Sequence, residues 1–465
     1  MSLLIKNATV VDGTGNAPYR ADILSQSGRI LAVGGIADYR ADESLDAAGM
    51  FAVPGFIDLV SYADVVSSPF ADCRQEDYLK QGVTTVVIGH SGHSLAPIFG
   101  RHTEYNRDWG LWSDFIRSAG RSRFGVRFLS FVGSRNLFHN DERVSLSLLD
   151  ASLSHGALGV SFGWSNQYSG LNGGLVHLAE SAARRGRLLS ATLPLNLTVK
   201  ERQRALLDLL RAKRRGEYDT VSGRRVASSR LVVSGVDKSD INYLKRSRSL
   251  HEVIIGYNPY DLRLVGVSSL LPSSLRPAFS DGSLWRSAAA SDRLQKHFRR
   301  FNPDSVFILS SSHPFFQKET LSSFASRLCL PPAAALVQIA KNYPHALLAF
   351  NTRVSPDWSP LKERQVFLSA IVAKGARRPF REFIGLGLKG SSWTLPNVVS
   401  RLSAAPAAAL GLGGDRGIIS PGRRADIVLI GKEGDISSVI VGGEISFSPY
   451  RHQTVTGTIE PYVYL

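Results

Sequence analysis

The sequence predicts an α/β protein built around a (β/α)8 TIM-type barrel, with a small β-sandwich domain formed by its N- and C-terminal segments. Three observations support this fold class: continuously apolar strand-like runs, amphipathic helix-like stretches between them, and short alternating strands with turns at both ends. Apolar strands that alternate with helices imply βα units and a parallel sheet buried on both faces. Periodicity alone leaves a doubly wound open sheet as an alternative to the barrel.

The two ends of the chain share one pattern. Near the start, strand-like segments at residues 21–24 and 30–34 flank the turn-forming residues 27–29. Near the end, the strand-like segments 425–430 and 439–444 also include turn residues, among them two adjacent glycines. Alternation bounded by Gly, Asn and Asp is the signature of β-hairpins, so both ends are expected to contribute to the β-sandwich.

The middle of the chain has a different period. Apolar runs recur at residues 84–88, 126–132, 158–162 and 231–234, and helix-like stretches include residues 147–155 and 175–184. With 465 residues, the chain is long enough for a large barrel and a smaller domain. We therefore predict the first part of the β-sandwich at residues 1–53, the barrel at 54–409 and the second part at 410–465.

The composition of the chain indicates the cellular compartment in which the protein is expected. No apolar run reaches the ~18 residues of a membrane-spanning helix, so no span is expected. The N-terminus lacks the basic start and long apolar stretch of a secretory signal. The two cysteines, Cys73 and Cys329, lie far apart, which fits a reducing, cytoplasmic setting.

The protein is strongly basic, with 55 Lys and Arg against 39 Asp and Glu and a net charge of +16. Basic runs at residues 211–215, 224–225 and 245–248 concentrate this charge in the middle third. Such a field attracts nucleic acid, anionic lipid or an acidic partner. The sequence has no zinc-finger spacing, RNP-type motif or helix-turn-helix signal, which favours a solvated arginine-rich surface over a dedicated nucleic-acid site.

Several motifs, in order along nearly the whole chain, carry a family resemblance. They are VPGFID at 53–58, QGVTTVVIG at 81–89 followed by GHSLAP at 92–97, GALGVSFG at 156–163 with Tyr168, NPY at 258–260, and PGRRADIV at 421–428. Together they resemble the amidohydrolase superfamily, and within it the D-aminoacylase branch. The resemblance implies a metal-dependent barrel flanked by a β-sandwich.

The family's chemistry depends on a metal, because Zn²⁺ both activates water and polarises the amide carbonyl. In the family, an Asp-x-His-x-His sequence on the first strand supplies two imidazoles. The same stretch of this chain begins at Asp58 and has Val60 and Tyr62 in the histidine places. The branch's second-strand cysteine is replaced by Ser91. These residues are weak ligands or cannot bind a metal at all.

Later family positions match less securely and follow the same trend. The His-x-Arg motif corresponds to Thr192 and its neighbours, the Ser-His pair to Ser234-Gly235, and the Ser-Asp pair to Ser369-Ala370. The expected vestigial site therefore comprises Val60, Tyr62, Asp64, Ser91, Thr192, Gly235 and Ala370. We expect no metal there and assign no catalytic residue.

The remaining histidines offer a fallback metal site. His90 and His93, three residues apart at the end of a predicted barrel strand, could form part of a replacement site. Polar residues at a loop mouth are the favoured interpretation. His155 and His177 are expected to be capping or surface residues.

Two function classes follow from the resemblance and its departures. The favoured one is a homologue that has lost metal-dependent hydrolysis and serves as a non-catalytic ligand- or protein-binding barrel. Its expected partners are an acidic protein, an active homologous subunit or a small molecule, with nucleic acid less favoured. The alternative is an active hydrolase of non-peptide C–N bonds, of the N-acyl-amino-acid deacylase type, with zinc in a reorganised site.

Overall fold

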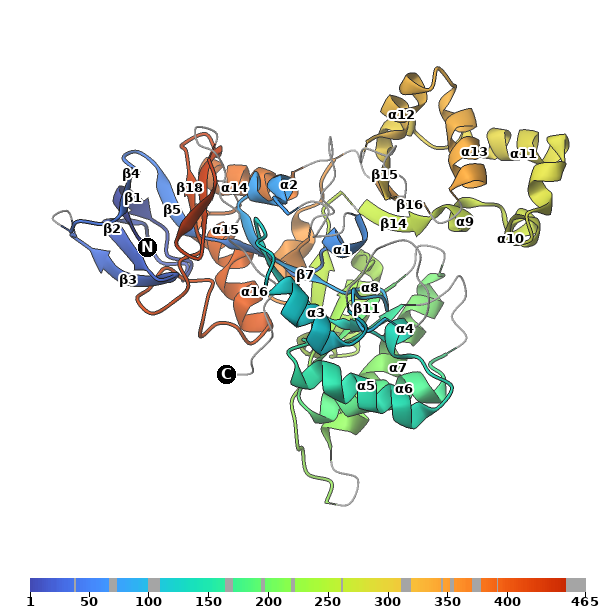
Figure 1. The fold of residues 1–465 in the computed structure, drawn as a ribbon, viewed down its shortest axis with the longest axis horizontal. Coiled ribbons are helices and arrows are strands. Elements are labelled where there is room, and N and C mark those ends of the chain that lie inside the picture. Colours follow the sequence, from blue (N-terminus) through green and yellow to red (C-terminus); the bar gives the residue numbers. More distant parts are fainter. Residues whose placement is uncertain are drawn as a thin grey trace.

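The computed structural model of the protein describes the chain except for residues 37–38, 67–72, 99–108, 164–169, 194–196, 219–221, 261, 311–318, 344–345, 352–354, 370–377, 391 and 449–465. Figure 1 shows three parts: a sheet that holds the N-terminus, a central array of strands and helices, and a smaller unit that projects from the array. This mixture of strands and helices confirms the predicted α/β class.

Segments from both ends of the chain form one eight-stranded sheet, in the order β20-β19-β18-β5-β1-β2-β3, with β4 paired to β1. Strand β18 pairs antiparallel with β5, which joins the two ends of the chain. The strands are β1 (Ser2–Val10), β2 (Tyr19–Gln26), β3 (Arg29–Gly34), β4 (Glu43–Asp46), β5 (Phe51–Pro54), β18 (Ile427–Ile430), β19 (Ile436–Val441) and β20 (Glu444–Phe447).

Two tight hairpins in this sheet confirm the hairpin prediction. Ser27 and Gly28 connect β2 to β3 with φ of 50° and 81°, and Gly442 and Gly443 connect β19 to β20 with φ of 60° and 78°. Two consecutive left-handed residues define the type I′ turn, whose twist matches that of paired strands. The glycines at these turns are therefore required by the backbone conformation.

Parallel strands form the central array, in two sheets with the orders β6-β7-β8 and β17-β13-β12-β11-β10-β9. Only Phe131 separates β8 from β9 in the chain, so the two sheets adjoin there. The strands are β6 (Phe56–Asp58), β7 (Val83–Ile88), β8 (Arg127–Ser130), β9 (Val132–Gly133), β10 (Gly159–Gly163), β11 (Leu188–Thr192), β12 (Leu231–Ser234), β13 (Val253–Tyr257) and β17 (Val366–Leu368). The four apolar runs predicted as strands are thus confirmed as β7, β8 with β9, β10 and β12.

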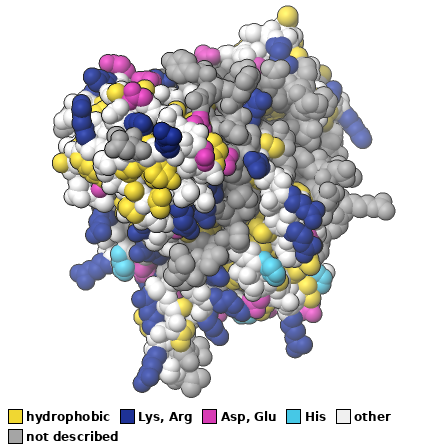
Figure 2. Space-filling model, turned by 60° about the vertical axis from the view of Figure 1, so that its left-hand side comes forward, with side chains coloured by type: hydrophobic (Ala, Val, Ile, Leu, Met, Phe, Trp, Pro, Cys, Tyr) yellow, Lys and Arg dark blue, Asp and Glu magenta, His cyan; other side chains and the backbone are white. Residues whose placement is uncertain are grey.

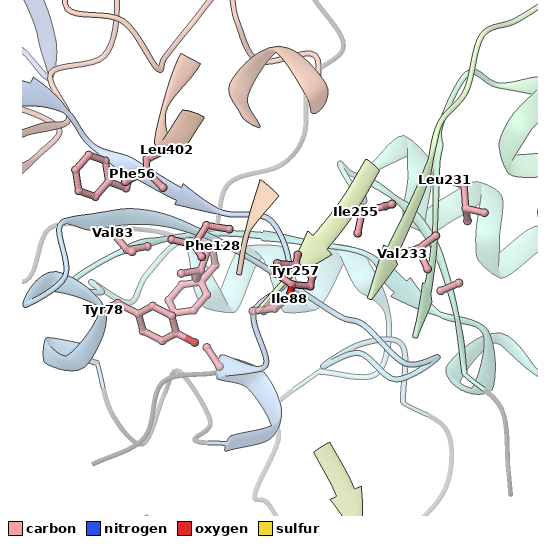
Figure 3. Close-up of a cluster of buried hydrophobic side chains, with 14 of the residues drawn as sticks. Phe56, Tyr78, Val83, Ile88, Phe128, Leu231, Val233, Ile255, Tyr257 and Leu402 are labelled. Atoms are coloured by element: carbon pink, nitrogen blue, oxygen red, sulfur yellow. The ribbon is translucent and has the colours of Figure 1, made fainter. Parts of the chain in front are cut away.

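Helices alternate with these strands, as the sequence predicts. A large buried cluster contains side chains from both the strands and the helices; Figure 3 shows several of them, among them Phe56, Phe128 and Ile255. The helices of the array are α1 (Ala63–Val66), α2 (Glu76–Leu79), α3 (Trp112–Ala119), α4 (Ser134–Leu137), α5 (Glu142–Ser154), α6 (Gly173–Arg184), α7 (Val199–Glu217), α8 (Lys238–Arg246), η1 (Leu250–Glu252), η5 (Ser359–Lys362), α14 (Pro379–Lys389), α15 (Leu395–Leu402) and α16 (Ala404–Ala409).

Two of these helices begin earlier than the sequence predicts. Helix α5 begins at Glu142 because the Asp141 side chain accepts a hydrogen bond from the Arg143 amide, and α6 begins at Gly173 because Asn172 caps the Leu175 amide. A cap residue satisfies an amide of the first turn that has no partner within the helix, so it fixes the start more firmly than the first apolar residue does.

A separate unit between β13 and β17 was not predicted from the sequence. Its antiparallel sheet has the order β14-β16-β15, and its own buried cluster includes Leu294, Ile308 and Leu336. Its elements are β14 (Leu262–Gly266), α9 (Val267–Leu270), η2 (Ser273–Leu275), α10 (Arg276–Ser280), η3 (Ser283–Arg286), α11 (Ala288–Phe298), η4 (Pro303–Ser305), β15 (Val306–Ser310), α12 (Leu321–Arg327), α13 (Pro332–Asn342) and β16 (Leu347–Asn351). We call residues 262–351 the inserted unit.

Within the described part of the chain, no single helix is long and apolar enough to cross a membrane. Helices α12 and α13, which bend by 89° at the break between them, are together long and apolar enough for a membrane span by length and composition alone.

A buried ion pair connects the terminal sheet to the array. Arg127 at the start of β8 donates from Nε to Asp426 Oδ1 at 3.3 Å, and the Gly442 amide donates to the same oxygen at 2.8 Å. Both charged side chains are less than a tenth exposed. Burial opposes ionisation of Asp426, but the Arg127 and Arg416 charges outweigh it and hold the pKa of this carboxyl below its usual range.

We predict that Arg127→Met lowers the free energy of unfolding by about 3–5 kcal/mol, because it removes the countercharge that is hydrogen-bonded to a buried carboxylate. The urea midpoint measures this loss. The exposed pair Arg117–Asp114 provides the matched control, and Arg117→Met should cost less than ~1 kcal/mol. Equal losses in the two variants would contradict the assigned role of Arg127.

Candidate functional site

The residues that the sequence places in the vestigial site lie near the carboxyl ends of the parallel strands. Val60 and Tyr62 follow β6, Ser91 follows β7, Thr192 ends β11, and Gly235 follows β12. Carboxyl ends of parallel strands meet at one edge of the array, where barrel proteins place their active sites. The structure thus brings positions that are far apart in the sequence to one edge.

Three hydroxyl groups meet at this edge. Tyr62 Oη lies 3.1 Å from Thr192 Oγ1 and 3.2 Å from Ser234 Oγ, and the latter two atoms are 3.1 Å apart. Tyr62 is 6% exposed and Ser234 is 7% exposed. Because hydroxyls both donate and accept, the three can satisfy one another without an ion or a charged partner. We call Tyr62, Thr192 and Ser234 the hydroxyl triangle.

Val60 lies in an apolar interior next to this triangle. It belongs to a buried cluster that contains Phe131 and Phe367 from the array and Phe307 from the inserted unit. The Ser369 hydroxyl, just after β17, donates to the Val60 carbonyl at 2.7 Å. Val60, which the family resemblance places at an imidazole position, therefore contributes packing.

His90 is also part of this interior and is 1% exposed. Its Nδ1 lies 2.9 Å from Ser190 Oγ, and its Nε2 lies 3.1 Å from the Val87 carbonyl. The carbonyl can only accept, so Nε2 carries the proton and Nδ1 accepts from the serine hydroxyl. Burial lowers the pKa of His90 to about 4, which keeps the ring neutral near neutral pH.

The fallback metal pair is not supported by this geometry. Both ring nitrogens of His90 have partners, whereas His93 is exposed and its Nε2 lies 3.3 Å from the Arg135 guanidinium. A cation next to His93 disfavours a second positive ion there. Asp64 accepts a hydrogen bond from the Gly89 amide at 2.9 Å, so this carboxylate orders the loop after β7.

Backbone conformation restricts two of the replaced positions. Ser91 has φ of 60° and lies between Gly89 and Gly92, each with φ of 77°. Gly235 has φ of 73°, and a Cβ atom added to it would lie 2.3 Å from the Leu193 carbonyl oxygen. A histidine at residue 235 would therefore require the backbone to move. The other expected position, Ala370, lies outside the described residues.

Two of the residues that complete the site were missed from the sequence. Ser190, the partner of His90, is a polar residue inside the apolar strand β11, and that interruption is the signal that could have identified it. Phe307 comes from the inserted unit, and no local pattern places it beside Val60. As expected, His155 is a cap residue and His177 lies on the surface of α6.

No protein-family model matches the chain. An N-acyl-D-aspartate deacylase of Alcaligenes xylosoxydans xylosoxydans is 30% identical over 181 residues, which cover 34% of this chain and 36% of that protein. An N-acyl-D-glutamate deacylase of the same organism is 30% identical over 212 residues, covering 40% of this chain and 43% of that protein. The sequence matches thus span less than half of each relative.

The relatives are N-acyl-D-amino-acid deacylases. An N-acyl-D-glutamate deacylase structure from Bordetella bronchiseptica, complexed with zinc and a phosphonate inhibitor, has a TM-score of 0.71 and 21% identity and covers 99% of both chains. Structural neighbours also include a D-aminoacylase described as defining a subset of amidohydrolases. The predicted resemblance to this superfamily is confirmed, and the structural match to a deacylase fold covers 99% of the chain.

The site residues of this deacylase homologue do not fit a bound zinc ion. Zinc takes nitrogen, thiolate or carboxylate donors that have an available lone pair. Val60 offers none, the Tyr62 hydroxyl is hydrogen-bonded, and both His90 nitrogens are engaged. Across the described ranges, no three His, Cys, Asp or Glu side chains come together as a metal site.

For this deacylase homologue we predict that the free energy of unfolding decreases at acid pH because His90 is buried in its neutral form. Its pKa is about 4 when folded and ~6.5 when unfolded. Between these two pH values the unfolded state binds more protons than the folded state. The contribution of neutral His90 to the free energy of unfolding is therefore fully present above pH ~6.5, and about 3 kcal/mol of it is lost as the pH drops to ~4.

Urea midpoints across this pH range, measured for the wild type, His90→Gln and the exposed control His155→Gln, test this prediction. His90→Gln should reduce the slope between pH ~6.5 and ~4, because glutamine does not titrate there, and the control should keep the full slope. Part of the slope remains in His90→Gln, because partial burial and the Arg135 charge also lower the pKa of His93 to about 4. Slopes rather than absolute stabilities are compared, because the substitution itself alters packing. An unchanged slope in His90→Gln would show that His90 is not buried in its neutral form.

Proposed function

We propose that this chain is a non-catalytic relative of the N-acyl-D-amino-acid deacylases that serves as a ligand- or protein-binding barrel. The single observation that carries the proposal is the chemistry at the first-strand positions. Val60 is packed among apolar side chains, and the Tyr62 hydroxyl bonds to Thr192 and Ser234. Neither residue can activate water or polarise an amide carbonyl as a metal does.

The barrel itself is part of this proposal. Each parallel strand of the array pairs with the one before it in the chain, apart from the junction of β8 and β9 at Phe131. The Ser369–Val60 hydrogen bond supports closure between the last strand, β17, and the first, β6. We accordingly assign residues 54–409 to a (β/α)8 barrel and residues 1–53 and 410–465 to a β-sandwich.

The hydroxyl triangle suggests what such a barrel could bind at its mouth. In the triangle each hydroxyl uses its proton and keeps one acceptor lone pair, so the triangle can accept from a small neutral polar donor and needs no countercharge. An acidic protein or an active homologous subunit is the alternative occupant, since the net charge of +16 favours acidic partners.

A second candidate function is active hydrolysis of non-peptide C–N bonds. The named activities of the relatives favour it, because these proteins deacylate N-acyl-D-aspartate and N-acyl-D-glutamate. This chain would then need zinc in a reorganised site, with His90, His93 and Asp64 as the first ligands to consider. His90 would have to break its bonds to Ser190 and Val87 to take part.

Elemental analysis and an activity assay distinguish the two functions. We predict that protein expressed with added zinc and purified without chelators contains only trace metal and releases no amino acid from N-acetyl-D-aspartate or N-acetyl-D-glutamate. The Bordetella bronchiseptica deacylase, treated identically, is the positive control. A stoichiometric metal content with turnover would replace the first proposal with the second.

Restoring the first-strand histidines is a sharper version of this test. The double variant Val60→His, Tyr62→His should remain inactive and gain little metal, because residue 235 is a glycine whose backbone does not accept a side chain. Robust deacylation by the double variant would show that the rest of a metal site is intact.

A further inference from the structure

The amino ends of the parallel strands carry a separate basic surface. Helices α6, α7 and α8 return the chain from the carboxyl edge to the starts of β11, β12 and β13. Their C-terminal turns and the segments that follow therefore gather at the amino edge, opposite the hydroxyl triangle. Hydrogen bonds confirm this proximity, since the Leu189 amide donates to the Arg230 carbonyl at 3.0 Å and Arg214 donates to Ser249 Oγ at 3.2 Å.

Some of the cations at this edge are neutralised by acidic partners. Arg215 pairs with Glu180 at 2.6 Å, and Glu252 pairs with both Arg214 and the buried Lys213, the latter at 2.9 Å. Three further pairs use the nearby acidic side chains: Arg185–Asp150, Arg211–Asp208 and Arg225–Glu217. These carboxylates are thus already paired with cations of the same edge.

Five further arginines at this edge have no acidic partner among the described residues. Arg184, Arg224, Arg230, Arg246 and Arg248 are exposed, and none of them forms an ion pair with any residue that the structure describes. We call these five residues the arginine edge. Figure 2 shows that Lys and Arg side chains outnumber acidic ones on the visible face of the molecule. Like charges along one edge raise the local potential and attract an anionic chain.

An exposed aromatic ring accompanies these arginines. Tyr218, directly after α7, is 44% exposed and pairs through its backbone with Arg225. A positive surface beside an exposed ring is the combination that single-stranded nucleic acid uses, since phosphates contact the cations and a base stacks on the ring. An acidic protein segment would use the charge alone.

We propose that the arginine edge is a binding surface for single-stranded nucleic acid, with the phosphate backbone on the guanidinium groups and a base on Tyr218. Guanidinium forks match phosphate oxygens in geometry and remain charged at every physiological pH. The surface is independent of the edge that holds the hydroxyl triangle. It therefore stands whether or not the chain hydrolyses an amide.

Fluorescence anisotropy with a short labelled oligouridine tests this assignment on the full chain. The triple variant Arg224→Gln, Arg230→Gln, Arg246→Gln should bind at least about tenfold more weakly at low salt, and the slope of log K against log salt should fall by about 2. The matched control, Arg293→Gln, Arg299→Gln, Arg300→Gln, removes the same charge from exposed positions of the inserted unit. Thermal melts confirm that both variants fold.

Substitutions at Tyr218 separate nucleic acid from other polyanions. Tyr218→Ala should weaken binding by about fivefold or more, whereas Tyr218→Phe, which keeps the ring, should bind like the wild type. Equal losses in the two arginine triples, or no binding by the wild type at low salt, would overturn the proposal. Displacement of the RNA by poly-L-glutamate, together with unchanged binding by Tyr218→Ala, would instead assign the surface to an acidic protein segment.

Discussion

A parallel sheet has to be covered on both faces, because its strands are apolar along their whole length. In this protein helices such as α5, α6 and α7 pack on one face, and aromatic and aliphatic side chains including Phe131 and Leu158 fill the other. With both faces committed to packing, only the two edges of the array remain for chemistry. The hydroxyl triangle lies at the carboxyl edge and the arginine edge at the amino edge.

The polar groups in the interior at the carboxyl edge form hydrogen bonds with one another and need no charged partner. Tyr62, Thr192 and Ser234 satisfy one another, and His90 is neutral between Ser190 and the Val87 carbonyl. A site that holds zinc instead directs available lone pairs of imidazole nitrogen, thiolate or carboxylate toward one point. The proposal that this fold works without the ion rests on this interior, where packing and neutral hydrogen bonds occupy the positions that the family resemblance assigns to metal ligands.

Charge is distributed differently over the rest of the molecule. At the junction with the terminal sheet, Arg127, Arg416 and Arg424 are paired with Asp426 and Asp415, and the carboxyls keep lowered pKa values despite burial. At the arginine edge the acidic side chains are outnumbered. The first arrangement stabilises the contact between two parts of the fold, whereas the second leaves an attractive field for a partner.

The sequence by itself determined the α/β class, the hairpins at both ends and the apolar strands of the array, because burial on two faces and left-handed turn residues leave strong local patterns. It also predicts that Val60, Tyr62 and Ser91 stand at ligand positions of the family, a prediction that depends only on a motif and its spacing. The starts of helices α5 and α6 and the presence of the inserted unit were harder to predict from the sequence. Helix caps and a second hydrophobic core leave only weak patterns in it. Only the tertiary structure decided that Tyr62 meets Thr192 and Ser234, that His90 is enclosed, and that Gly235 leaves no room for a side chain. Each of these depends on distances between strands that are remote in the chain.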